Sequence, residues 1–181
     1  MTAITARELL NRLEQQTEGH IQTAIRLWQN MDDAQLLAPP PQGGWSIAQC
    51  LEHLNGYGHH YFKEIRTAMA RRNDVAELYK PTWLGNYFTK TLDPDLGKRK
   101  IKTFAKHNPP PSLDARAVVA EFIRQQEDLL TLLREARHKN LNAIKIPTTL
   151  SKWVRMNLGD TFRFVIAHNE RHIRQAKRVM A

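Results

Sequence analysis

Four long segments repeat their apolar residues at the 3.6-residue spacing of an amphipathic helix, which restricts the fold more than any other feature of the sequence. They cover residues 5–30, 46–72, 113–137 and 160–179. No segment alternates apolar and polar residues convincingly enough to predict a strand, and no internal repeat is found. The periodicity therefore predicts an all-α fold, a four-helix bundle in which every helix buries one face.

Two of these segments open with sequences typical of a helix start. Thr5 is followed three residues later by Glu8, and Ser46 in the same way by Gln49. In such a capping box the hydroxyl accepts a hydrogen bond from the third helical N–H, and the longer side chain reaches back to the cap. The sequence therefore predicts helix starts at Thr5 and Ser46.

The connections after the second and third helices are long. Residues 73–111 are broken by prolines but contain "WLGNYF" at 83–88, too apolar a stretch to be free in solvent. We expect an ordered connection with a short helix around 83–91, and a second long connection at 140–159. The whole chain, residues 1–181, is expected to form a single domain.

Composition narrows the function classes. The single cysteine, Cys50, excludes an internal disulfide and lies in an apolar stripe, where a buried structural thiol is expected. With no signal peptide and no long apolar run, we expect a cytoplasmic protein that does not enter a membrane. The net charge of +9 is spread out, apart from "KRKIK" at 98–102 and the last helix. No nucleic-acid motif accompanies it, so nucleic-acid binding is not expected.

Three histidines are candidates for a metal site. His168 and His172 lie one turn apart on the predicted last helix and project from the same face. At 100° per residue from Phe162, they fall at about 240° and about 280°, at the edge of the apolar stripe. His53 lies at a similar edge of the second helix. Three imidazoles from two helices can bind Zn²⁺ or Ni²⁺ and leave a coordination position open. By spacing alone, two surface histidines on a basic helix remain the alternative.

Five further side chains are candidates for supporting the histidines or lining a cleft: Gln49, Tyr57, His60, Arg171 and Gln175. Gln49 either supports His53 or only caps its helix. Gln175 either contacts the site or is exposed, and Arg171 either pairs with an anionic substrate or lies on a solvated face.

The remaining polar residues of interest are assigned structural roles. Asn169 falls at about 340°, amid the apolar stripe, and predicts a buried hydrogen bond between helices. Four other histidines are interpreted as ordinary exposed or packed residues: His20, His59, His107 and His138.

The segments "GGWSIAQCLEHLNGY" (43–57) and "LGDTFRFVIAHNERHIRQ" (158–175) resemble the DinB-like superfamily of four-helix-bundle metalloproteins. That family carries a Trp-Ser helix start leading to a histidine, and then a His-x-x-x-His on the last helix followed by glutamine. The matching positions here are Trp45, Ser46, His53, His168, His172 and Gln175. "WLGNYF" is also similar to the family, and the resemblance extends over nearly the whole chain.

The resemblance implies a divalent metal, Zn²⁺ or Ni²⁺, held by His53, His168 and His172. It also implies kinship with bacillithiol S-transferases and mycothiol-dependent isomerases, in which the metal holds a small thiol as thiolate. We therefore expect a thiol S-transferase or a hydrolase, acting on a small-molecule thiol and an electrophilic substrate. The alternative is a non-catalytic stress-response binding module whose metal is structural or absent. Family members often form homodimers, and the aromatic residues at 83–87 offer an interface.

Overall fold

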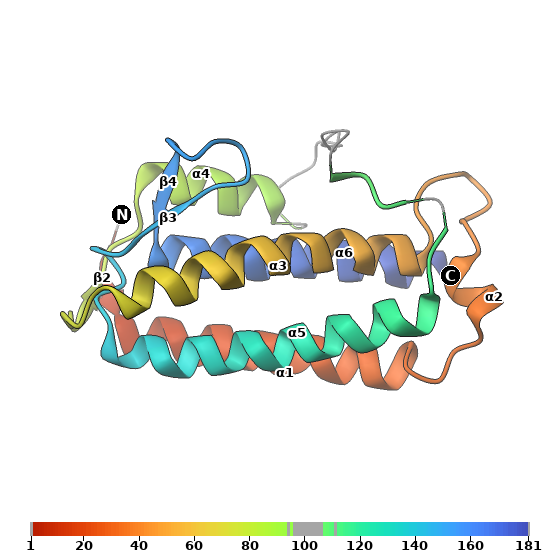
Figure 1. Ribbon diagram of the computed structural model, residues 1–181, viewed down its shortest axis with the longest axis horizontal. Helices are drawn as coiled ribbons and strands as arrows, with labels where there is room; N and C mark the ends of the chain where they lie inside the picture. The colour runs from red at the N-terminus through yellow and green to blue at the C-terminus, as the bar shows by residue number, and fades with distance from the viewer. Residues whose placement is uncertain (1, 94, 96–106, 111, 181) are drawn as a thin grey trace.

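The computed structural model describes residues 2–93, 95, 107–110 and 112–180. Four long helices form the bundle: α1 (Ala6–Leu27), α3 (Ile47–Ala70), α5 (Ala115–Glu135) and α6 (Leu158–Val179). Helices α3 and α6 form one layer, and α1 and α5 form the other (Figure 1). Each helix of one layer packs on one helix of the other, so α5 and α6 stand at opposite corners. The predicted all-α four-helix bundle is confirmed.

The helices begin where the side chains of their first residues satisfy free backbone N–H groups. Ser46 and Gln49 form both bonds of the predicted capping box, at 3.2 and 3.0 Å. Thr5 caps α1 by accepting a hydrogen bond from the N–H of Glu8 at 3.1 Å. Helix α6 begins two residues earlier than expected, because Asn157 caps it through the N–H of Asp160 at 2.6 Å.

The connections contain short elements, only some of which the sequence predicts. The predicted helix around residues 83–91 is confirmed as α4 (Trp83–Leu92). Helix α2 (Asp33–Leu37), the 3-10 turn η2 (Ala136–His138) and two antiparallel strand pairs are additional. The pairs join β1 (Ile4–Thr5) to β2 (Leu78–Tyr79), and β3 (Lys145–Pro147) to β4 (Arg155–Asn157). The expectation of no strands was wrong, because strands this short show no alternation.

None of the helices in the described part of the chain is long and apolar enough to cross a membrane.

Cys50 is fully buried in the bundle core beside Ile47 and Leu51, as expected from its apolar stripe, and this burial raises the pKa of its thiol to about 12. A thiol in this environment stays protonated and behaves as a small apolar side chain. The basic run at 98–102 lies outside the described residues.

Helix α4 and the β3–β4 pair cover the outer face of the α3–α6 layer (Figure 1). The fully buried carboxylate of Asp160 fixes the start of α4. It accepts hydrogen bonds from the hydroxyl of Tyr79 at 2.5 Å, and from the N–H and hydroxyl of Thr82 at 3.1 and 2.7 Å. A side chain at Gly85 would overlap this carboxylate, so glycine allows α4 to approach α6 closely. This packing builds one wall of the candidate site.

Candidate metal centre

The three predicted ligand histidines meet between α3 and α6. His53, His168 and His172 are each at most 8% exposed, and one ring nitrogen from each lies within 4.8 Å of the others. The Nε2 atoms of His53 and His168 are 3.1 Å apart. Two nitrogens that bind one Zn²⁺ at about 2.0–2.1 Å are separated by at most about 4.2 Å, so this pair fits a shared ion.

Hydrogen bonds at the opposite ring nitrogens orient two of these imidazoles. His53 Nδ1 donates to the carbonyl oxygen of His107 at 2.8 Å, and His172 Nδ1 donates to Gln175 Oε1 at 2.9 Å. A neutral imidazole that donates through Nδ1 carries its lone pair on Nε2. Facing imidazole nitrogens attract each other only through a proton or a cation between them. Histidines that bind metals are oriented by this kind of contact, so the donor set fits a divalent ion.

The surroundings of the histidines favour their neutral form. Burial is the main cause that lowers the pKa of all three, well below its usual value for His168 and to about 3 for His172. The neighbouring imidazoles lower the pKa of His168 and His172 further, because positive charges so close repel one another. All three side chains are therefore neutral near pH 7, as metal ligation requires.

Aromatic rings surround the three imidazoles. The Trp45 ring centroid lies 4.9 Å from that of His53 and 5.6 Å from that of His172. Tyr57 packs against His53 and His168 at 5.0 and 4.4 Å. Burial also raises the pKa of Tyr57, so its phenol is neutral. These contacts restrict the imidazoles to a few orientations and exclude solvent from one side of the cluster.

The histidines open on a cavity of about 820 Å³. Its walls come from α3, α6, one side of α4, and the loops at 40–45 and 148–150. Small-molecule sites commonly have volumes of about 300–1,000 Å³, so this cavity is large enough for a small substrate.

The five supporting candidates have different positions. Tyr57, Arg171 and Gln175 line the cavity, and Gln175 also bonds His172. Gln49 bonds the backbone of Ser46 and so acts as a helix cap. His60 packs its ring on Tyr61 at 5.0 Å and is not among the described residues that line the cavity.

His107, interpreted from the sequence as an ordinary exposed or packed residue, contacts the site through its backbone and its ring. Its carbonyl accepts the hydrogen bond of His53, and its ring packs 4.9 Å from that of Tyr57. Any residue type offers a carbonyl, and His107 lies in a connection without periodicity, so no sequence signal could have found it.

The DinB superfamily model matches residues 16–176 of the sequence. The chain belongs to the DinB superfamily. Among curated proteins, none matches the sequence. A solved structure with a similar fold is that of YfiT from Bacillus subtilis, described as a probable metal-dependent hydrolase with an unusual four-helix bundle topology. It aligns with a TM-score of 0.60 and 15% identity, over 94% of this chain and 85% of that chain. At this identity the likeness shows the fold alone.

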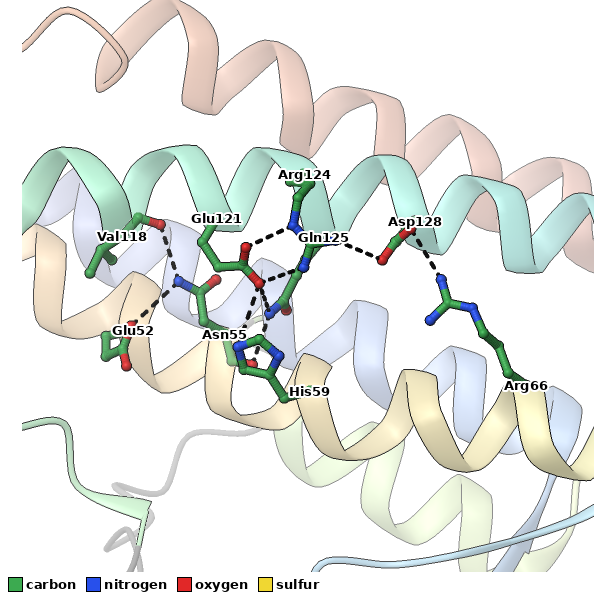
Figure 2. A network of polar contacts seen from close by, with 9 residues as sticks. All are labelled: Glu52, Asn55, His59, Arg66, Val118, Glu121, Arg124, Gln125 and Asp128. Atoms are coloured by element: carbon green, nitrogen blue, oxygen red, sulfur yellow. Dashed lines mark hydrogen bonds and ion pairs between the residues drawn. The ribbon is translucent and has the colours of Figure 1, made fainter.

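In this DinB bundle, two consecutive glutamines of α5 bond the helices that carry the histidines. Gln125 donates to the carbonyl of Asn55 in α3 at 3.1 Å, two residues after His53 (Figure 2). Gln126 accepts from the side chain of Asn169 in α6 at 2.9 Å, one residue after His168. The predicted buried hydrogen bond of Asn169 is therefore confirmed.

Both contacts lie in the bundle interior, where an unsatisfied amide is costly. Gly58 of α3 lets Gln125 approach, because a Cβ at this position would overlap the glutamine side chain. Since each glutamine bonds a backbone or side-chain group next to a ligand histidine, the two bonds hold α3 and α6 in one axial register. This register sets the position of His53 along the bundle axis relative to that of His168.

Glu121, which contacts Gln125 in α5, is expected to make the free energy of unfolding decrease at acid pH. It pairs with Arg124 at 2.7 Å and accepts from Gln125 at 2.8 Å (Figure 2). These interactions lower the pKa of Glu121 from 4.5 to about 2, and the hydrogen bond from Arg124 is the largest cause. The stabilisation is therefore complete above pH 4.5 and is lost as the pH falls towards 2.

Urea unfolding of the metal-free protein between pH 5 and pH 3 measures this contribution. Because Arg124 is largely solvated, we expect Glu121→Gln to lower the free energy of unfolding at pH 5 by about 1 kcal/mol, and by less at pH 3. Glu127→Gln removes the same charge from an exposed position of α5 and is the control. If the free energies of unfolding of wild type and Glu121→Gln changed by the same amount between pH 5 and pH 3, the stabilising role of the Glu121 carboxylate would be contradicted.

Proposed function

We propose that this DinB-superfamily protein is a divalent-metal enzyme for small molecules, a thiol S-transferase or a hydrolase. Its metal, Zn²⁺ or Ni²⁺, would be held by His53, His168 and His172. The observation that carries the proposal is the convergence of three buried, neutral imidazoles on the wall of a cavity of about 820 Å³. The description of YfiT as a probable metal-dependent hydrolase supports it as a likeness of fold.

A bound divalent ion with an open position would lower the pKa of a thiol or a water there, so that either loses its proton near neutral pH. The chain contributes orientation and exclusion of water. The His107 carbonyl and Gln175 amide hold the Nδ1 protons of His53 and His172, which keeps both Nε2 lone pairs directed inward. Trp45 and Tyr57 cover the histidines, and Tyr87 and Phe88 of α4 offer an apolar surface to the substrate.

In the thiol-transfer reaction, the thiol sulfur would form a bond to the electrophilic carbon. The leaving group would depart with the electron pair of its broken bond, and the thiol proton would pass to solvent. The aromatic rings that cover the histidines suit this reaction, because water is a competing nucleophile.

Cobalt-loaded protein gives a direct test. We expect one Co²⁺ per chain and a new charge-transfer band when 2-mercaptoethanol is added, since thiolate coordination to Co²⁺ absorbs light. A pH-dependent spectrum that does not respond to thiol would favour the hydrolase. Stoichiometric metal whose spectrum responds to neither thiol nor pH would contradict the enzyme and favour the binding module with a structural metal.

A further inference from the structure

The cavity beside the histidines carries positive charge along α6. Arg171 and Arg178 both line it, together with His168, His172 and Gln175. Residues three, four or seven positions apart share one face of a helix, so these five side chains form a single stripe along the cavity. Among the described lining residues, the formally charged side chains are these two arginines alone.

Two other arginines of α6 are not among the described residues that line the cavity. Arg174 bonds Asp95 at 2.7 Å and Glu170 at 2.6 Å, and Arg163 pairs with Asp160 at 3.3 Å. Carboxylates of the chain therefore neutralise these two charges. The side chain of Arg171 is partly buried where it lines the cavity. Two like charges facing one partly desolvated cavity are stabilised when an anion binds between them.

Another part of the cavity lining is apolar. Tyr87, Phe88 and Leu92 of α4 lie there, held in place through the contact of Asp160 with Thr82. A ligand that pairs with the arginines and also packs against α4 has an acidic group and an apolar part.

We propose that the substrate of this site is a small carboxylic acid, whose carboxylate pairs with Arg171 and Arg178 while its reacting group lies at the three histidines. The planar guanidinium fork matches a carboxylate, with which it forms two parallel hydrogen bonds. Arg171 lies between the two histidines in the sequence, and Arg178 lies about 9 Å beyond His172 along the helix axis at 1.5 Å per residue. A single small acid can therefore lie along this face of α6, with its carboxylate at the arginines and its reacting group at the histidines. The inference rests on the proposed function, because it describes the substrate of the same site.

A pair of thiols that differ by one carboxylate tests the inference. N-acetylcysteine carries the carboxylate and N-acetylcysteamine lacks it, and titration of each into cobalt-loaded protein gives a dissociation constant from the charge-transfer band. We expect wild type to bind N-acetylcysteine at least about 10-fold more tightly, corresponding to 1.4 kcal/mol. Arg171→Gln should remove most of this preference, and Arg178→Gln, at the exposed rim, a smaller part.

Lys177→Gln is the matched control, since it removes a positive charge from an exposed position of α6 outside the described cavity lining. Its two dissociation constants should equal those of wild type at the same ionic strength. A preference lost equally in Lys177→Gln and Arg171→Gln would overturn the inference, because it would then reflect only the net charge of the protein.

The two proposals fail in different ways. Equal binding of both thiols by wild type would overturn the carboxylate preference and leave the metal enzyme standing. A spectrum that responds to neither thiol would contradict the thiol chemistry, and calorimetry of metal-free protein then decides the inference. Hexanoate, but not 1-hexanol, should bind wild type, and Arg171→Gln should weaken it about 10-fold. Absence of heat with hexanoate would overturn the inference.

Discussion

Replacing His168 with alanine should abolish stoichiometric divalent-metal binding and raise the metal dissociation constant by more than about 100-fold. Loss of an outer contact to a ligand already costs about 10–100-fold, and removal of a ligand itself costs more. His168 contacts both of the other ligands, because its Nε2 faces that of His53 at 3.1 Å and its ring packs against His172 at 4.8 Å. The two remaining imidazoles would leave the ion largely hydrated and weakly held.

Metal content after dialysis and Co²⁺ titration measure this effect. His138→Ala makes the same chemical change at an exposed position and should retain wild-type metal binding. Circular dichroism of metal-free His168→Ala should show the wild-type helix content, which separates loss of the ligand from loss of the fold. Unchanged metal stoichiometry in a folded variant would remove the proposed site.

Replacing Asp160 with alanine should lower the free energy of unfolding by about 3–5 kcal/mol, the cost of breaking a buried charged network. The carboxylate is fully buried and accepts hydrogen bonds from Tyr79 and Thr82, and it pairs with Arg163. Without it, the phenol of Tyr79 and the hydroxyl and backbone N–H of Thr82 lose their acceptor, and Arg163 loses its carboxylate partner. Helix α4 should then separate from α6, since Thr82 is the N-cap of α4.

Urea unfolding gives the stability change, and hydrogen exchange gives its location. Amides of α4 should exchange faster in Asp160→Ala than in wild type, relative to those of α1. Asp33→Ala removes an exposed carboxylate that pairs with Arg116 and should change stability by less than about 0.5 kcal/mol. A similarly small change in Asp160→Ala would show that the buried network does not hold α4.

Much of this structure could be predicted because its determinants are local. The apolar spacing in residues 46–72 and 160–179 predicts two helices whose histidines lie at stripe edges, and α3 and α6 meet at these edges. The Ser46–Gln49 capping box depends on residues three apart, so it too could be predicted. The strand pairs could not, because Ile4 pairs with Tyr79 across a long stretch of chain and each strand is too short for a periodic signal.

By itself, the sequence determined which faces of the helices are buried, where several helices begin, and that His53, His168 and His172 lie at stripe edges, since each depends on spacing of a few residues. Only the tertiary structure decided that the His107 carbonyl orients His53, that α4 is fixed over the site by Asp160, and that Arg171 and Arg178 face the same cavity as the histidines. These features join segments far apart along the chain. Their energies come from burial and from hydrogen bonds that exist only when the helices are packed.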